Sequence, residues 1–244
     1  MALLLKDATR SRCPFSEYPS ATMTSVISKV TYPMFSQIQG DPERLAAIYR
    51  KLIRISFFVI APIMLGAAAI AEPLFFLLLG EAWLPAVLIF QILTLAMMLY
   101  PIHAFNLNIL QVYGRSDLFL KLEVIKKIII TIAVIVAFQF GLMGLVWSSV
   151  FTSFAGLGVN MFYSSKLINY SIHKQISDLG VTFFLAFISA MSMFAITLAL
   201  VKIIMILQII ISSLVGCLVY MGLNYCITNS PLHEAIQLFK YRNQ

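Results

Sequence analysis

The chain has 244 residues, of which 61% are hydrophobic and only 11% are charged, and its formal net charge is +7. Because roughly a quarter of the residues in soluble domains are charged, this composition excludes an ordinary soluble domain and indicates several membrane spans. The basic excess does not favour nucleic acid as a partner, because Lys and Arg stand between apolar runs and not along one face.

The first predicted helix has a polar face. Residues 1–19 show no pattern and receive no assignment, but from Ser20 to Gln37 polar residues recur every three or four positions. Lys29, Ser25 and Ser28 belong to this polar face. A charge within the bilayer needs a partner or a water-filled cavity, which favours a helix that lines a pathway. The alternative is an amphipathic helix in the membrane interface.

The second predicted helix contains the clearest span. Asp41 is suited to cap its start and Pro42 to stand in its first turn. An uncharged apolar run from Ile55 to Ala71 is about as long as the hydrocarbon core requires. Three basic residues precede it, which predicts a cytoplasmic start: Arg50, Lys51 and Arg54. Pro62 predicts a kink, which is either a fixed bend or a hinge.

A third helix is predicted from about Pro85 to Val112. Four polar side chains fall within half of its circumference at 100° per residue: Gln91, Thr94, His103 and Asn106. Polar residues inside a membrane are candidates for a substrate pathway. Amides also tie helices together, and His103 could equally be a hydrogen-bonded imidazole beside a kink at Pro101.

Two further spans follow a basic segment at 115–127. The fourth is predicted from about 119 to 140, and residues 141–144 are predicted to form an uncharged turn. The fifth, from 145 to 165, has small and polar residues along one face, which favours close helix packing. Together with residues 20–114, these elements form a predicted unit from 20 to 176.

The C-terminal part predicts two more spans. Residues 179–224 are twice as long as one span requires, so we expect two helices within 177–228 and a turn near Lys202. Residues 229–244 predict an amphipathic helix on the cytoplasmic membrane surface.

The distribution of Lys and Arg supports this count. Successive loops are alternately rich and poor in basic residues, as the positive-inside rule requires. The sequence therefore predicts an all-α, polytopic bundle of about seven transmembrane helices, with the N-terminus outside and the C-terminus inside.

No sequence motif indicates catalysis. There is no HExxH zinc motif, Walker loop, Ser-His-Asp set or Asp-rich metal motif, and the three cysteines show no metal-binding spacing. We therefore expect no enzyme, no metal and no cofactor. Polar faces and kinks within spans favour a transporter.

Several segments, in this order, resemble the C-terminal half of bacterial polysaccharide (O-antigen, Wzx-type) flippases of the multidrug/oligosaccharidyl-lipid/polysaccharide exporter superfamily. The segments are Tyr32–Leu45, Pro62, Glu72–Leu74, Gly80–Trp83, Gln91–Leu93, Gly114–Leu118 and Gly141–Gly144.

The resemblance implies two six-helix lobes around a central cavity and two extra C-terminal helices. It also implies movement of an undecaprenyl-diphosphate-linked oligosaccharide across the bacterial cytoplasmic membrane by alternating access. On this basis residues 20–176 belong to the C-terminal lobe. The N-terminal lobe has no counterpart here, so the expected partners are that lobe or another subunit, the lipid-linked oligosaccharide and membrane lipids.

The diphosphate and sugars of such a substrate need a cationic, hydrogen-bonding surface. Lys29, with Ser25 and Ser28, is the predicted cationic element, and Gln91, His103 and Asn106 are predicted to face sugar hydroxyls. A cation-coupled drug or lipid exporter would need a carboxylate in the middle of a span, and none of the predicted spans has one. A non-transporting membrane subunit would lack the polar face of residues 20–37. A membrane glycosyltransferase would need larger outer loops.

Overall fold

The computed structural model describes residues 29, 31–168, 170–201 and 203–227, and these residues contain helices and no strand. In chain order the elements are α3 (Pro42–Ala69), α4 (Ala71–Leu79), the 3₁₀ helix η2 (Glu81–Ala86), α5 (Val87–Met97), α6 (Tyr100–Val112), α7 (Ser116–Phe138), α8 (Gly141–Ile168), α9 (Ile172–Ala199) and α10 (Met205–Cys226). Residues 31–37, before α3, are also helical. The predictions for residues 1–19, Ser25, Ser28 and 229–244 lie outside the described residues.

The predicted start of α3 is confirmed. The Asp41 carboxylate accepts a hydrogen bond from the Arg44 amide at 3.0 Å, and Pro42 stands in the first turn, where it needs no hydrogen-bonded N–H. The helix then continues for 28 residues through Pro62. One continuous helix therefore contains both the basic segment and the apolar run.

The third predicted helix is divided in the structure. Helix α5 ends at Met97 and α6 begins at Tyr100, so that Pro101 lies in the first turn of a new helix. Because proline has no N–H to bond the carbonyl four residues earlier, the chain restarts the helix at this point. The predicted span from about Pro85 to Val112 is present, but it consists of two helices where a kink at Pro101 was expected.

The turn predicted at residues 141–144 was wrong. The chain reverses at Gln139 and Phe140, and α8 already begins at Gly141. Gly141 has a φ of +66°, a left-handed conformation that glycine adopts without steric cost. This glycine therefore allows a very short connection between α7 and α8.

Within the described residues, five stretches of helix are long and apolar enough to cross a membrane: Pro42–Ala69, Glu81–Val112, Gly141–Ile168, Ile172–Ala199 and Met205–Cys226. They correspond to five of the seven predicted spans, including both helices expected after residue 177. The sixth is α7, whose 23 residues extend about 35 Å at 1.5 Å per residue, although its first half is charged. The seventh, residues 20–37, lies largely outside the described residues.

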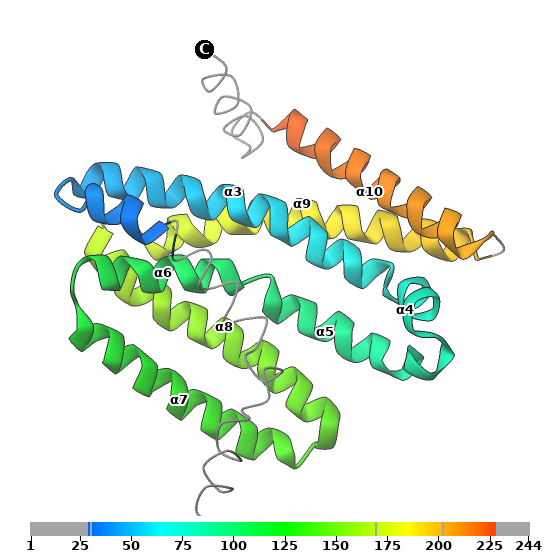
Figure 1. Ribbon diagram of the computed structural model, residues 1–244, viewed down its shortest axis with the longest axis horizontal. Coiled ribbons are helices and arrows are strands. Elements are labelled where there is room, and N and C mark those ends of the chain that lie inside the picture. Colours follow the sequence, from blue (N-terminus) through cyan, green and yellow to red (C-terminus); the bar gives the residue numbers. More distant parts are fainter. Residues whose placement is uncertain (1–28, 30, 169, 202, 228–244) are drawn as a thin grey trace, which may run out of the picture.

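The two ends of the bundle differ in charge. Figure 1 shows that α3 begins at the end where α6 connects to α7 and α8 connects to α9. From Arg44 to Lys174, all Lys and Arg residues belong to these connections or to the helix halves next to them: Arg44, Arg50, Lys51, Arg54, Arg115, Lys121, Lys126, Lys127, Lys166 and Lys174. The opposite end carries Glu72 and Glu81. The positive-inside rule predicts that the basic end faces the cytoplasm.

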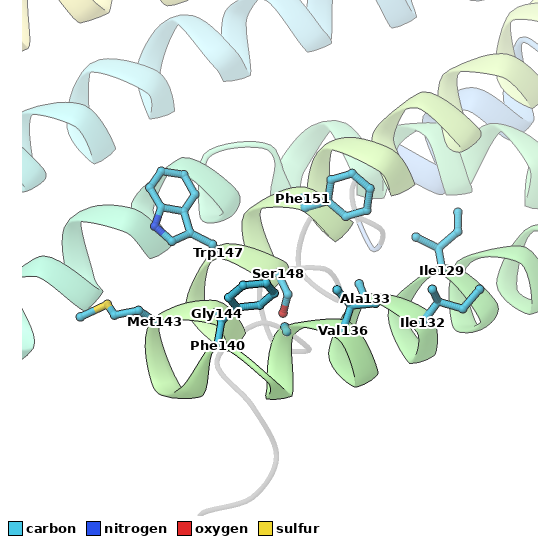
Figure 2. A pocket seen from close by; sticks show the side chains of 11 residues that line it. Ile129, Ile132, Ala133, Val136, Phe140, Met143, Gly144, Trp147, Ser148 and Phe151 are labelled. Atoms are coloured by element: carbon cyan, nitrogen blue, oxygen red, sulfur yellow. The ribbon is translucent and has the colours of Figure 1, made fainter.

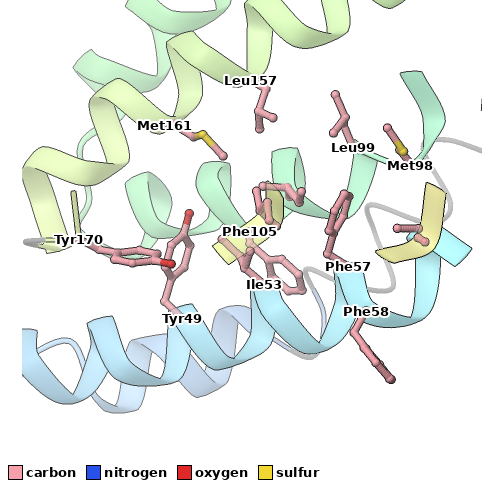
Figure 3. Packing of buried hydrophobic residues seen from close by; sticks show 14 of the residues in the cluster. Tyr49, Ile53, Phe57, Phe58, Met98, Leu99, Phe105, Leu157, Met161 and Tyr170 are labelled. Atoms are coloured by element: carbon pink, nitrogen blue, oxygen red, sulfur yellow. The ribbon is translucent and has the colours of Figure 1, made fainter. Parts of the chain in front are cut away.

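Helix α3 provides the centre of the core. Its buried face, with Tyr49, Ile53 and Phe57, packs against Phe105 of α6 and Met161 of α8 (Figure 3). Lipid tails are as apolar as these side chains, so association inside a bilayer depends on close packing and hydrogen bonds more than on the hydrophobic effect. The polar contacts between helices therefore contribute to the association of the helices as the packed core does.

Several such contacts fasten α10 to α9 and α3. The Ser189 hydroxyl donates to the Gly216 carbonyl at 2.7 Å, and the Gln208 amide donates to the Thr197 carbonyl at 2.6 Å. The Tyr220 hydroxyl donates to the Phe58 carbonyl of α3 at 2.8 Å. These bonds satisfy buried polar groups and fix how α10 is placed on the bundle.

Candidate functional site

A cavity of about 490 Å³ lies among α5, α6, α7 and α8. Apolar side chains form most of its wall, but polar side chains from three helices also contact it: His103, Lys126, Ser149, Thr152 and Ser153. We call this cavity the polar pocket. A polar concavity within a transmembrane bundle is a candidate for substrate or ion binding.

A chain of hydrogen bonds holds His103. The Ser153 hydroxyl donates to the Ala96 carbonyl at 3.2 Å, so its oxygen is free to accept from His103 Nε2 at 3.4 Å. His103 Nδ1 lies 2.9 Å from the Asn160 amide nitrogen, which has only hydrogens to offer. The arrangement fits a neutral imidazole with its hydrogen on Nε2.

Lys126 is the cation of the polar pocket. It pairs with Glu123, one turn earlier on α7, and its side chain is 17% exposed. A Cβ built at Gly156 would lie 3.7 Å from both His103 Cε1 and Lys126 Cδ. Such distances are ordinary van der Waals contacts, so His103 and Lys126 both pack close to α8 at Gly156. Because an ammonium has three donors, Lys126 can contact an anion while it is paired with Glu123.

Asn106 lies in the core and not in the polar pocket. It is fully buried, and its oxygen accepts hydrogen bonds from the Tyr49 hydroxyl, at 2.8 Å, and from the Ser164 hydroxyl. Its amide donates to the Ile102 carbonyl at 2.8 Å. Asn106 therefore ties α6 to α3 and α8.

The other predicted site residues are dispersed. Gln91 donates to the Ala68 carbonyl at 2.9 Å and so ties α5 to the end of α3. Lys29 is exposed, and Ser25 and Ser28 lie outside the described residues. Of the six predicted residues, the structure places His103 in the polar pocket.

Comparisons with known proteins relate this architecture to polysaccharide biosynthesis. Residues 13–88 match a family model described as polysaccharide biosynthesis protein. An uncharacterized membrane protein in the cps region of Klebsiella pneumoniae is 35% identical over 78 residues, which make up 32% of this chain and 16% of that protein. The lipopolysaccharide biosynthesis protein WzxC of Escherichia coli (strain K12) is 24% identical over 170 residues, 69% of this chain and 35% of that protein.

Residues 13–88 are thus similar to a polysaccharide biosynthesis protein family. The succinoglycan biosynthesis transport protein ExoT of Rhizobium meliloti (strain 1021) is also similar, with 30% identity over 69 residues, 28% of this chain and 14% of that protein. The chain thus spans about a third or less of the length of each of these proteins. No solved structure matches the chain.

Most residues of the polar pocket were not predicted as a site. The sequence assigned Lys126 to a group of loop charges, and Ser149, Thr152 and Ser153 to a face for helix packing. The signal that could have found them was the pairing of that polar face with a lysine on the preceding helix. Only the tertiary arrangement shows that Lys126 and α8 face the same cavity.

Proposed function

We propose that this chain takes part in the flipping of an undecaprenyl-diphosphate-linked oligosaccharide across the bacterial cytoplasmic membrane, together with a second lobe or subunit. The observation that carries the proposal is the polar pocket, a cavity with Lys126 and several hydroxyls inside a bundle of apolar helices. The names of the relatives support polysaccharide as the cargo.

Flipping moves the substrate across the membrane without making or breaking a covalent bond. A diphosphate and its sugars lose their hydration as they enter the membrane, so they need a cation and hydrogen-bonding groups along their path. Lys126 supplies the charge. The hydroxyls of Ser149 and Thr152 donate to backbone carbonyls of α8, so their oxygens can accept hydrogen bonds from sugar hydroxyls. The lipid part of the substrate stays in the bilayer.

The residues predicted from sequence keep their place in the proposal. Lys29, with Ser25 and Ser28, is a second cationic element, and His103 is a sugar contact within the polar pocket. For Gln91 and Asn106 the hydrogen bonds to other helices favour a positioning role.

The test is complementation of cells from which the gene has been deleted. The cells express the wild-type chain, Lys126→Gln, or Lys127→Gln, which changes the exposed neighbouring lysine. We measure the amount of surface glycan and the amount of lipid-linked precursor in each strain. We expect deletion to lower surface glycan and to raise the precursor, and wild type and Lys127→Gln to reverse both changes. Lys126→Gln should restore about ten-fold less glycan, the factor that corresponds to about 1.4 kcal/mol. If deletion changes neither quantity, the proposed function is wrong.

A further inference from the structure

Helix α3 lacks one backbone hydrogen bond at Pro62. Proline has no N–H, so the carbonyl of Phe58, four residues earlier, has no donor in its own helix. The helix nevertheless continues through this position, from Pro42 to Ala69. Inside a bilayer there is no water to satisfy such a carbonyl. Its donor therefore has to come from a neighbouring helix.

Tyr220 of α10 provides the missing donor. Its hydroxyl donates to the Phe58 carbonyl at 2.8 Å, and the centroids of the two rings lie 5.1 Å apart. Tyr220 is 3% exposed and Phe58 is 6% exposed. Figure 3 shows that the Phe58 side chain points away from that of Phe57. A buried hydrogen bond between two helices thus replaces a bond within α3.

The helix that carries Tyr220 is attached to α9. The Ser189 hydroxyl of α9 donates to the Gly216 carbonyl of α10, and the Thr197 hydroxyl donates to the Ser212 hydroxyl at 2.9 Å. The donor for the Phe58 carbonyl therefore belongs to the pair of α9 and α10. A movement of this pair relative to α3 would remove it.

A cavity of about 460 Å³ adjoins Pro62, among α3, α9 and α10. We call it the Pro62 cavity. Pro62 and Gly66 line it from α3, and Gly216 and Tyr220 line it from α10. The part of α3 that follows Pro62 therefore has space into which it can tilt.

Space alone does not allow a helix to bend. A larger cavity, of about 770 Å³, lies between α7 and α8, with Ile132, Phe140 and Trp147 in its wall (Figure 2). Among the described residues that line it there is no proline. Because sharp bends occur mainly where proline or a similar defect interrupts the hydrogen bonds of a helix, α7 and α8 have no such point there. At Pro62 a missing helix bond and adjacent space coincide.

We propose that Pro62 is a hinge of α3 and that the hydrogen bond from Tyr220 holds this hinge in one of two positions. In the first position the bond is formed and the Pro62 cavity is open. In the second position the bond is broken and residues 63–69 tilt into the cavity. The second position is less populated, because the Phe58 carbonyl then lacks its donor. The pair of α9 and α10 thereby controls the shape of α3, and this inference does not rest on the proposed function.

The alternative is a fixed bend, in which Tyr220 only stabilises the fold. Both explanations predict that loss of the Tyr220 hydroxyl lowers the free energy of unfolding, so stability does not distinguish them. A hinge also predicts a change in the distances between residues beyond Pro62 and the rest of the bundle. A fixed bend predicts no such change.

The experiment measures distances between two spin labels by pulsed electron paramagnetic resonance, on the full chain in phosphatidylcholine nanodiscs. The native cysteines are replaced by serine, and labels are attached to introduced cysteines at exposed positions. One pair, Glu72→Cys with Leu142→Cys, lies at the end of the bundle to which residues 63–69 lead. The other pair, Ala47→Cys with Ser116→Cys, lies at the basic end and serves as the reference.

Tyr220→Phe, Pro62→Ala and the double variant are compared with wild type. Tyr220→Phe keeps the ring and removes the donor, whereas Pro62→Ala returns an N–H to the Phe58 carbonyl. Tyr163→Phe, on α8, is the control for loss of a tyrosine hydroxyl, because Tyr163 does not line the Pro62 cavity. Circular dichroism verifies that each variant retains its helices.

We expect two distance populations for the pair at positions 72 and 142. Tyr220→Phe should raise the ratio of the second population to the first about five-fold, as expected for the loss of one hydrogen bond. Pro62→Ala should suppress the second population with or without Tyr220→Phe, because α3 then satisfies the Phe58 carbonyl itself. The reference pair should keep one distance in every variant, and Tyr163→Phe should match wild type.

Unchanged distances in Tyr220→Phe would overturn the hinge and favour the fixed bend. An equal response to Tyr220→Phe in the presence and in the absence of Pro62→Ala would show that Tyr220 does not act through Pro62. A similar change in the reference pair would indicate general loosening of the bundle and would also overturn the hinge. Because the measurement requires neither glycan nor transport, its outcome is separate from that of complementation.

Discussion

The guanidinium of Arg50 on α3 donates two hydrogen bonds to the carboxylate of Asp178 on α9, from Nε to Oδ2 at 2.6 Å and from Nη2 to Oδ1 at 2.9 Å. The Tyr170 hydroxyl, in the connection between α8 and α9, donates to the same carboxylate at 2.6 Å. Burial and this hydrogen bond raise the pKa of the Tyr170 hydroxyl, so it remains a donor. Three segments of the chain are thus joined at the basic end of the bundle.

Asp178→Asn should weaken the attachment of α9 to α3. The Arg50 side chain is 46% exposed and that of Asp178 14%, so solvent screens the pair and the expected loss is about 1 kcal/mol. The measurement is a double-mutant cycle of unfolding in detergent with Arg50→Gln, Asp178→Asn and the double variant. Strictly additive single losses would show that the ion pair contributes nothing.

Gly216→Val should separate α10 from α9. A Cβ at Gly216 would lie 2.2 Å from Met193 Cγ, whereas a Cβ at Gly222, on the same helix, meets no atom within 4 Å. Overpacking of this kind costs about 1–3 kcal/mol. We expect Gly216→Val to lower the thermal midpoint in detergent, and Gly222→Val to leave it close to wild type.

A second substitution, at Met193, tests whether the contact between Gly216 and Met193 causes this loss. If the contact with Met193 is the cause, Met193→Ala should recover part of the midpoint lost in Gly216→Val. An equal effect of the two glycine substitutions would point to helix propensity and would contradict the packing explanation.

Asn106→Leu should be more damaging than Tyr49→Phe. The first leaves the buried Tyr49 hydroxyl without its acceptor, which costs about 1–3 kcal/mol. It also removes one of the two acceptors of the Ser164 hydroxyl, which keeps its bond to the Met161 carbonyl. The second removes one donor while Ser164 still satisfies Asn106, at a cost of about 0.5–1.5 kcal/mol. Chemical unfolding of both variants gives the comparison, and the reverse order would exclude a structural role for Asn106.

The transmembrane architecture could be predicted because its determinants are local. Apolar length and the alternation of basic loops located the spans, and the Asp41 cap located the start of α3. The division at Met98 was missed because Pro101 permits either a kink or a restart, and only the packing of α5 and α6 decides between them.

The candidate site was harder to predict because it depends on contacts between helices. A helical wheel places His103 and Asn106 on the same half of one helix, yet the first borders a cavity and the second is fixed in the core. Lys126 was identified as a loop charge, since its sequence position near the cytoplasmic end does not reveal that α8 offers Gly156 opposite it. The neighbouring helices determine the surroundings of each residue, and a helical wheel of one helix does not include them.

The proposed transport role requires membrane-crossing helices with their basic end in the cytoplasm, and cysteine labelling in cells tests this arrangement directly. Cys13, Cys217 and Cys226 are first replaced by serine, and then single cysteines are introduced as Glu81→Cys and Ser116→Cys, both at exposed positions. A membrane-impermeant maleimide should label Glu81→Cys in intact spheroplasts and Ser116→Cys only after the membrane is opened. Labelling of both positions from the same side would contradict the account.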